Sequence, residues 1–356
     1  MDRVTLRDGC LDVMVEGLTF ANGLLLGGND VIDAETWDSS DIQHRKALRR
    51  LALLAEDVGL SDADLGRHPG HEPIPADRDT HVVMQHRLRI LFPGCYVVGE
   101  EATEHDWWAA IGSPPGSLIF SIDALDGSTL YESFTFGYAC NLLAYRRVKG
   151  NENLLMFAAV MNSSGFVACY QRDEQGALVG NVYTATDIAL GTDTDDSAAR
   201  GAAIGKRLVS ITDPVVLDGF RADTVATNAS DPARRRVIAP LLADKDLYVS
   251  TLGGAPAALG LVLGGLAALV CPRAQTTYDT AYLPILASLG ITIYTMHEGK
   301  EGFTLGLKEV LGFFDHLAGV GGAWTTEGVT KPVPAFVAAR NPQFGAELRR
   351  RIIEQY

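Results

Sequence analysis

The sequence predicts an α/β (α+β) protein made of two subdomains. The chain has 356 residues, of which 47% are hydrophobic, so it can bury a sizeable core. In its first half, apolar residues at helical spacing precede a series of short apolar strands, and a second α/β half follows. We expect an N-terminal extension at residues 1–38, a first subdomain at 39–190 and a second at 191–356.

The elements of the first half can be assigned in order. Asp8-Gly9 and Asn22-Gly23 lie between apolar stretches, which predicts β-hairpins in the N-terminal extension. Ser39-Ser40 is expected to cap one helix, and residues 80–91 are expected to form another. The expected strands span residues 95–99, 117–122, 138–145, 154–161 and 165–170.

The second half contains a long apolar segment from Leu252 to Pro272, which raises the question of a membrane span. Its glycines and Pro256 instead predict a buried helix followed by a strand. We expect the second α/β half to end in residues 336–341 and a C-terminal helix from Phe344. The chain is therefore not expected to have a membrane as a partner.

Composition narrows the class of protein. A net charge of −14 argues against binding to a nucleic acid polymer, because such binding needs a basic surface. The five cysteines are odd in number and lie in apolar contexts without metal-site spacing, which is typical of buried thiols in a reducing compartment. No secretory leader opens the chain. We therefore expect a cytoplasmic protein.

The most informative segment places Asp123 and Asp126 three residues apart, directly before Gly127 and Ser128 and after an apolar strand. Two carboxylates that leave a strand in a tight turn can face one point, and hard oxygen ligands suit magnesium rather than zinc or copper. The glycine and serine offer backbone N–H groups to an anion. The alternative is an ordinary turn or helix cap, which uses the same residue types.

Two other acidic segments decide between these interpretations. Glu100-Glu101 ends a short apolar strand, and Asp279 opens an apolar segment that we expect to be a helix. Alone, the glutamates would be a solvated loop and Asp279 a helix cap. The three acidic segments together, each at the end of an element, favour a shared metal site. The spacing excludes an EF-hand calcium loop, and no P-loop motif occurs.

These motifs resemble those of the lithium-sensitive, magnesium-dependent phosphomonoesterases, which include inositol monophosphatases, fructose bisphosphatases and bisphosphate nucleotidases. The family pattern Gly-Glu-Glu, Asp-Pro-x-Asp-Gly-Ser/Thr and Trp-Asp-x-Ala is similar to residues 99–101, 123–128 and 278–281. The resemblance runs from about residue 40 to the C-terminus. It implies a layered αβαβα sugar-phosphatase-like fold, hydrolysis of a small phosphorylated substrate by metal-activated water, and a possible homodimer.

The resemblance also implies roles for individual residues. Two or three Mg²⁺ ions would be held by Glu100, Asp123, Asp126, Asp279, Asp77 and the backbone carbonyl of Leu125. The catalytic residues would be Ser128, Asp77 and Glu100, with Ser128 bonded to the attacking water and Asp77, or its rival Asp79, helping to orient that water. The amides of Gly127 and Ser128 would bind phosphate, and the substrate would contact Gly254, Ala255 and Arg273.

The chain departs from the family pattern near the substrate. Ala124 replaces the usual proline, and Pro272 lies where inositol monophosphatases have a glutamate that binds the hydroxyl groups of the substrate ring. The segment from Cys271 to Asp279 resembles the Tyr-Pro-Arg-to-Trp-Asp segment of bisphosphate nucleotidases, although it is two residues shorter. Arg273 could grip a second phosphate, or it could be a surface arginine.

These features favour a nucleotide (bis)phosphate as substrate. The alternatives are an inositol or sugar monophosphatase, or a catalytically weak binding or regulatory protein of the same fold.

Overall fold

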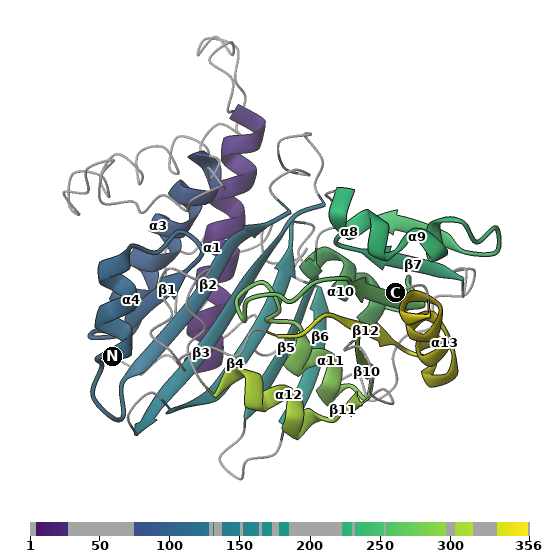
Figure 1. The fold of residues 1–356 in the computed structure, drawn as a ribbon. Helices are drawn as coiled ribbons and strands as arrows, with labels where there is room; N and C mark the ends of the chain where they lie inside the picture. Colours follow the sequence, from purple (N-terminus) through teal and green to yellow (C-terminus); the bar gives the residue numbers. More distant parts are fainter. Residues whose placement is uncertain are drawn as a thin grey trace.

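The computed structural model describes twelve parts of the chain: residues 5–27, 75–127, 131, 137–149, 152–163, 166–172, 178–184, 223–229, 232–252, 254–296, 303–315 and 333–354. These parts form two six-stranded sheets with helices before, between and behind them (Figure 1).

The first sheet is mostly antiparallel. Its strands, in spatial and chain order, are β1 (Tyr96–Gly99), β2 (Leu118–Asp126), β3 (Ala139–Lys149), β4 (Glu152–Asn162), β5 (Phe166–Arg172) and β6 (Leu178–Thr184). Only β1 and β2 run parallel, and helix α4 (Glu104–Ile111) connects them. The strands predicted between residues 95 and 170 are therefore confirmed as β1 to β5.

The second sheet is mixed. Its strands lie in the order β11 (Thr304–Leu305), β10 (Thr292–Thr295), β12 (Phe336–Ala339), β9 (Ala268–Cys271), β7 (Thr224–Thr227) and β8 (Tyr248–Thr251). Strand β7 pairs in parallel with β8 and β9, and the other pairs are antiparallel. The predicted subdomain boundary at residue 190 falls between the two sheets, in residues outside the described parts.

Helices separate the two sheets and cover their outer faces, giving five layers (Figure 1). Helices α1 (Leu6–Gly27) and α3 (Pro75–Leu91) share a buried cluster with the outer face of the first sheet. Between the sheets lie α10 (Gly254–Val262), α11 (Leu283–Ser288) and α12 (Leu307–Phe314). Behind the second sheet lie α8 (Pro232–Val237), α9 (Ala239–Leu242) and α13 (Pro342–Ile353). This confirms the expected αβαβα fold class.

The N-terminal extension corrects one prediction, because its residues 6–27 form a helix rather than hairpins. Its buried residues Cys10, Met14, Leu18 and Ala21 recur at helical spacing and face α3 and the first sheet. Burial of this stripe outweighs the turn preference of the Asp-Gly and Asn-Gly pairs, which then lie inside the helix.

A buried ion cluster holds α1 against α3. Arg87 on α3 donates to Asp12 at 3.1 Å and lies 3.1 Å from Glu16. The Asp12 carboxylate is fully buried, and a buried carboxylate needs a close cationic partner such as this guanidinium. Gly17 allows the close approach, because a Cβ there would lie 2.7 Å from the Met84 side chain.

The apolar segment 252–272 forms the buried helix α10 and strand β9, as predicted. Within the described parts of the chain, none of the helices combines the length and apolar character that crossing a membrane would need. All five cysteines are free, and only Cys95 is partly exposed. The helix expected after Ser39-Ser40 lies outside the described residues.

Candidate metal centre

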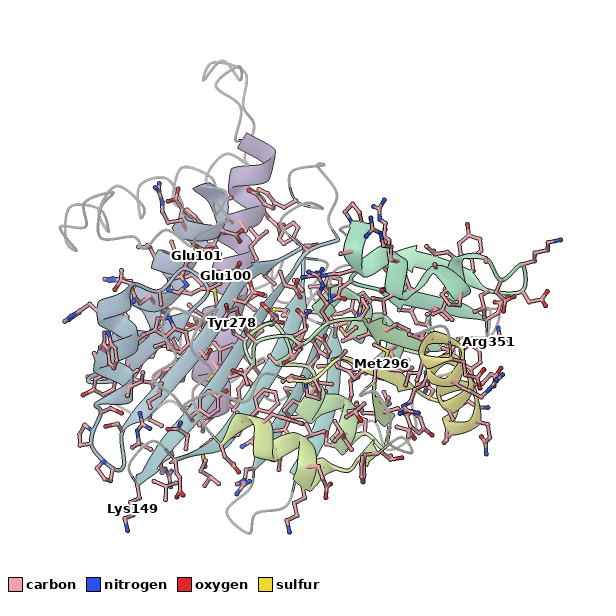
Figure 2. The ribbon with its side chains drawn as sticks, viewed as in Figure 1. Glu100, Glu101, Lys149, Tyr278, Met296 and Arg351 are labelled. Carbon is pink, nitrogen blue, oxygen red and sulfur yellow. The ribbon has the colours of Figure 1, made fainter. Side chains whose placement is uncertain are left out.

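The parallel pairing of β1 and β2 brings the first two acidic motifs together. Gly99 pairs with Ile122, so Glu100 and Asp123 follow at the same edge of the sheet. Gly99 has a steric reason to be glycine, since a Cβ there would clash with the backbone carbonyl of Ile122. Figure 2 labels Glu100 and Glu101 at this end of the first sheet, with Tyr278 nearby.

Asp279 reaches the same point from the second half of the chain. Carboxylate oxygens of Glu100, Asp123 and Asp279 all lie within 4.8 Å of one another. Asp279 was predicted to lie at the start of a helix, and this prediction is wrong. The residue lies in a hydrogen-bonded turn, four residues before α11 begins at Leu283. Bonds from Thr280 to the carbonyl of Thr276 shape this turn.

Asp126 lies at the end of β2, past an irregularity in the β2–β3 pairing between Asp123 and Asp126. Its Oδ2 accepts a 2.6 Å hydrogen bond from the backbone N–H of Ala255, in the first turn of α10. Asp126 therefore faces the positive end of that helix. A Cβ at Gly254 would lie 3.1 Å from the Tyr282 hydroxyl, so this helix start is closely packed.

The carboxyls of the centre raise one another's pKa values. Burial, and then the charges of Asp279, Glu101, Asp77 and Asp126, hold the pKa of Glu100 well above its usual value. The pKa of Asp123 is raised well above its usual value by burial and the same kind of repulsion. Burial raises the pKa of Asp126 to about 7, although the hydrogen bond from the Ala255 N–H opposes this rise. Such mutual repulsion is relieved when a cation binds.

Asp77 and Asp79, the two candidates for the third-ion residue, differ in their surroundings. Asp77 lies in the first turn of α3, is 8% exposed and raises the pKa values of Glu100 and Asp123. Asp79 pairs with Arg78 at 3.2 Å. Of the two, Asp77 is therefore the residue whose charge acts on the carboxyls of the centre.

Asn141 belongs to the centre, although its sequence context did not mark it. It lies on β3 opposite Asp123, and its Nδ2 donates to Asp123 Oδ2 at 3.3 Å and to the carbonyl of Tyr278 at 3.2 Å. The signal available in the sequence was that Asn141 is polar within an apolar strand. A polar residue there must find partners when it is buried.

The other residues predicted for the site lie at the end of β2, in the turn that follows it, and after β9. Leu125 is buried at the end of β2, where its N–H donates to Asp123 Oδ1 at 3.2 Å. Gly127 has a φ of 96°, a conformation suited to glycine, and turns the chain away from the strand. Arg273 is exposed after β9. Ser128 lies outside the described residues.

The donor set fits a hard divalent cation. The cluster is made of carboxylate oxygens without histidine or cysteine, and Asp123 is only 4% exposed. Oxygen ligands of this kind suit Mg²⁺, Mn²⁺ or Ca²⁺ better than zinc or copper. Because several buried carboxyls oppose one another's ionisation, the arrangement is better suited to an ion than to an empty core.

Comparison with solved structures supports the fold. CysQ from Bacteroides thetaiotaomicron, a bacterial member of the inositol monophosphatase family, is 13% identical, with a TM-score of 0.52 over 94% of this chain and 96% of that chain. SuhB from Mycobacterium tuberculosis is 16% identical, with a TM-score of 0.49 over 98% and 95%. No protein-family model and no curated protein matches the sequence. The likeness to CysQ establishes that the two chains share a fold.

Proposed function

We propose that this protein is a magnesium-dependent phosphomonoesterase that hydrolyses a small phosphorylated metabolite. The observation that carries the proposal is the meeting of Glu100, Asp123 and Asp279 within 4.8 Å, on a fold shared with a member of the inositol monophosphatase family. The three carboxylates come from three separate motifs, so chance proximity on a surface does not explain them.

Hydrolysis of a phosphate monoester requires a cation at the phosphoryl group, and this cluster of carboxylates is suited to hold one. Hydrolysis of a phosphate monoester is among the slowest uncatalysed reactions, because anionic phosphoryl oxygens repel a nucleophile. Magnesium bound there would neutralise those oxygens and lower the pKa of a bound water. Glu100, Asp123 and Asp279 would hold the metal, with Asp126, Asp77 and the Leu125 carbonyl completing the sites for two or three ions.

Other residues of the chain would orient the reactants. The amides of Gly127 and Ser128 would bind the phosphate, and the Ser128 hydroxyl would hold the attacking water, with Asp77 and Glu100 close to it. We also propose that Gly254 and Ala255 contact the substrate, because the hydrogen bond from the Ala255 N–H to Asp126 places the start of α10 next to the acidic cluster.

A nucleotide (bis)phosphate is the substrate that we favour. Pro272 and Arg273 support it, and Arg273 is exposed, so its guanidinium can meet a ligand from solvent. An inositol or sugar monophosphate is the second candidate. A catalytically weak binding protein of the same fold is the candidate of another class. A cytoplasmic location and a homodimer remain predictions, the former supported by five free cysteines.

The test is phosphate release from a panel of nucleotide phosphates, nucleotide bisphosphates, inositol phosphates and sugar phosphates. Each is assayed with magnesium, with EDTA, and with Asp126→Asn. We expect magnesium-dependent release that the variant loses, with nucleotides preferred. Release that persists in EDTA would overturn the proposal, and tight magnesium binding without release from any substrate would favour the binding protein.

A further inference from the structure

We infer that Asn141 is a positioning residue that fixes the Asp123 carboxylate relative to the turn that carries Asp279. The inference rests on the proposed function, because it assigns to Asn141 a role in holding a cation. Asn141 lies in the middle of the first sheet, directly opposite Asp123, and is 1% exposed.

The chemistry of the two hydrogen bonds determines how the Asn141 amide is oriented. Its partners are a carboxylate oxygen of Asp123 and the backbone carbonyl of Tyr278, at 3.3 and 3.2 Å. A backbone carbonyl can only accept hydrogen bonds, so the amide nitrogen must face Tyr278, and the same nitrogen then donates to Asp123. Asn141 therefore acts as a donor that joins two acceptors, which would otherwise repel each other.

Asp123 is held from two sides as a result. Its Oδ2 accepts from Asn141, and its Oδ1 accepts from the N–H of Leu125 at 3.2 Å. Each donor is neutral and fixes the orientation of the Asp123 carboxylate. Each carboxylate oxygen still has a free lone pair that can coordinate a cation. Without these donors, repulsion from the neighbouring carboxylates would favour rotation of Asp123 away from the centre.

The second bond reaches the other half of the site. The Tyr278 carbonyl lies directly before Asp279 in the chain, and the Tyr278 side chain is itself buried. Asn141 and Tyr278 are 137 positions apart, so this single side chain connects the first sheet to the turn that carries Asp279. The Asn141 amide therefore contacts both Asp123 and the residue that precedes Asp279.

The unused end of the amide supports this assignment. Asn141 Oδ1 is buried and has no hydrogen-bond partner among the described residues. A buried acceptor without a partner costs stability, and leucine, whose side chain has the same branched arrangement of heavy atoms, would avoid that cost. What the asparagine provides at this position is therefore its donor group.

The experiment separates positioning from packing. Asn141→Leu keeps the branched heavy-atom arrangement and removes both hydrogen bonds, and Asn141→Ser leaves a smaller side chain with a hydroxyl too short to join both partners. The control is Asn153→Leu, a buried asparagine on β4 that lies opposite Arg147, six residues along β3 from Asn141. Mg²⁺ is titrated by calorimetry, and the melting temperature of each metal-free protein is recorded.

We expect both Asn141 variants to bind Mg²⁺ about 10- to 100-fold more weakly than the wild type, while the control keeps wild-type affinity. Wild-type Mg²⁺ affinity in a folded Asn141 variant would overturn the inference, whatever the melting temperature does. If Asn141→Leu fails to fold, the Mg²⁺ affinity of Asn141→Ser tests the inference. A wild-type protein that binds no Mg²⁺ would instead overturn the metal centre itself, and the inference with it.

Discussion

The backbone N–H of Ala255 donates a 2.6 Å hydrogen bond to the carboxylate of Asp126, which joins residues 129 positions apart in the chain. Asp126 belongs to the motif at the end of β2, and Ala255 belongs to the first turn of α10 between the sheets. The bond therefore connects the acidic motif of the first half to the helix start that we propose for substrate binding.

Neutralising one member of the acidic cluster should have opposite effects on stability and on metal binding. Asp279 raises the pKa values of Glu100, Asp123 and Asp126, so its charge opposes theirs. Asp279→Asn should stabilise the metal-free protein by about 1 kcal/mol at neutral pH and remove the stabilisation that Mg²⁺ gives the wild type.

Urea denaturation with Mg²⁺ and with EDTA measures both effects. The control is Asp246→Asn, at an exposed position, which should change neither. A metal-free Asp279→Asn protein that is less stable than the wild type would show that the carboxylates do not repel one another as described.

Gly99 should not tolerate a side chain, because its Cβ would clash with the Ile122 carbonyl where β1 meets β2. Gly99→Ala should destabilise the protein by about 3 kcal/mol and weaken Mg²⁺ binding, since Glu100 follows directly. The control is Gly312→Ala on α12, where a Cβ meets nothing within 4 Å and alanine should stabilise by about 0.5–1 kcal/mol. Chemical denaturation checks both, and equal effects of the two substitutions would refute the steric argument.

The ion cluster between α1 and α3 should be sensitive to loss of its cation. Arg87→Met leaves the fully buried Asp12 without its guanidinium, which should cost about 3–5 kcal/mol. Arg350→Met removes a cation from exposed pairs with Glu347 and Glu354, and should cost far less, because solvent screens exposed ion pairs. Denaturation midpoints of the two variants are compared, and an equally mild effect of both substitutions would contradict the stabilising role of the buried cluster.

His81 should make the protein acid-sensitive. It is buried on α3 beside Gly99, and burial, helped by Arg89, lowers its pKa to about 4 although Asp106 opposes this. Because the pKa is depressed on folding, the stabilisation is present above pH 6.5 and is lost as pH falls toward 4. Between pH 7 and 4.5, the wild type should lose about 2 kcal/mol more than His81→Leu.

The matched control for this titration is His86→Leu on the same helix, at a half-buried position. Unfolding free energies at the two pH values give the comparison, in which the control should keep the wild-type pH dependence. If His81→Leu keeps it as well, the acid sensitivity comes from other groups.

Most of the first sheet and the acidic motifs could be predicted from the sequence because their signals are local. Apolar runs bounded by turn residues gave β1 to β5, and a carboxylate at each strand end indicated where the acidic residues would meet. Pairing of β1 with β2 then follows the ordinary preference for parallel neighbours across a helix.

The errors arose where contacts distant in the chain decide the structure. The glycine pairs of the N-terminal extension signal turns locally, but burial against α3 makes residues 6–27 a helix. Asp279 lies in a turn because its segment is anchored by Asn141 and the Thr276 carbonyl. The role of Asn141 depends on the register of β3 with β2, which no local pattern reveals.

The most direct test of the metal centre is a crystal of the wild-type protein soaked in Mn²⁺, with an anomalous difference map calculated at the manganese absorption edge. We predict a peak bounded by the carboxylates of Glu100, Asp123 and Asp279, with the Asn141 amide still bonded to Asp123. A map with no peak among these three carboxylates, or with peaks only elsewhere on the protein, would contradict it.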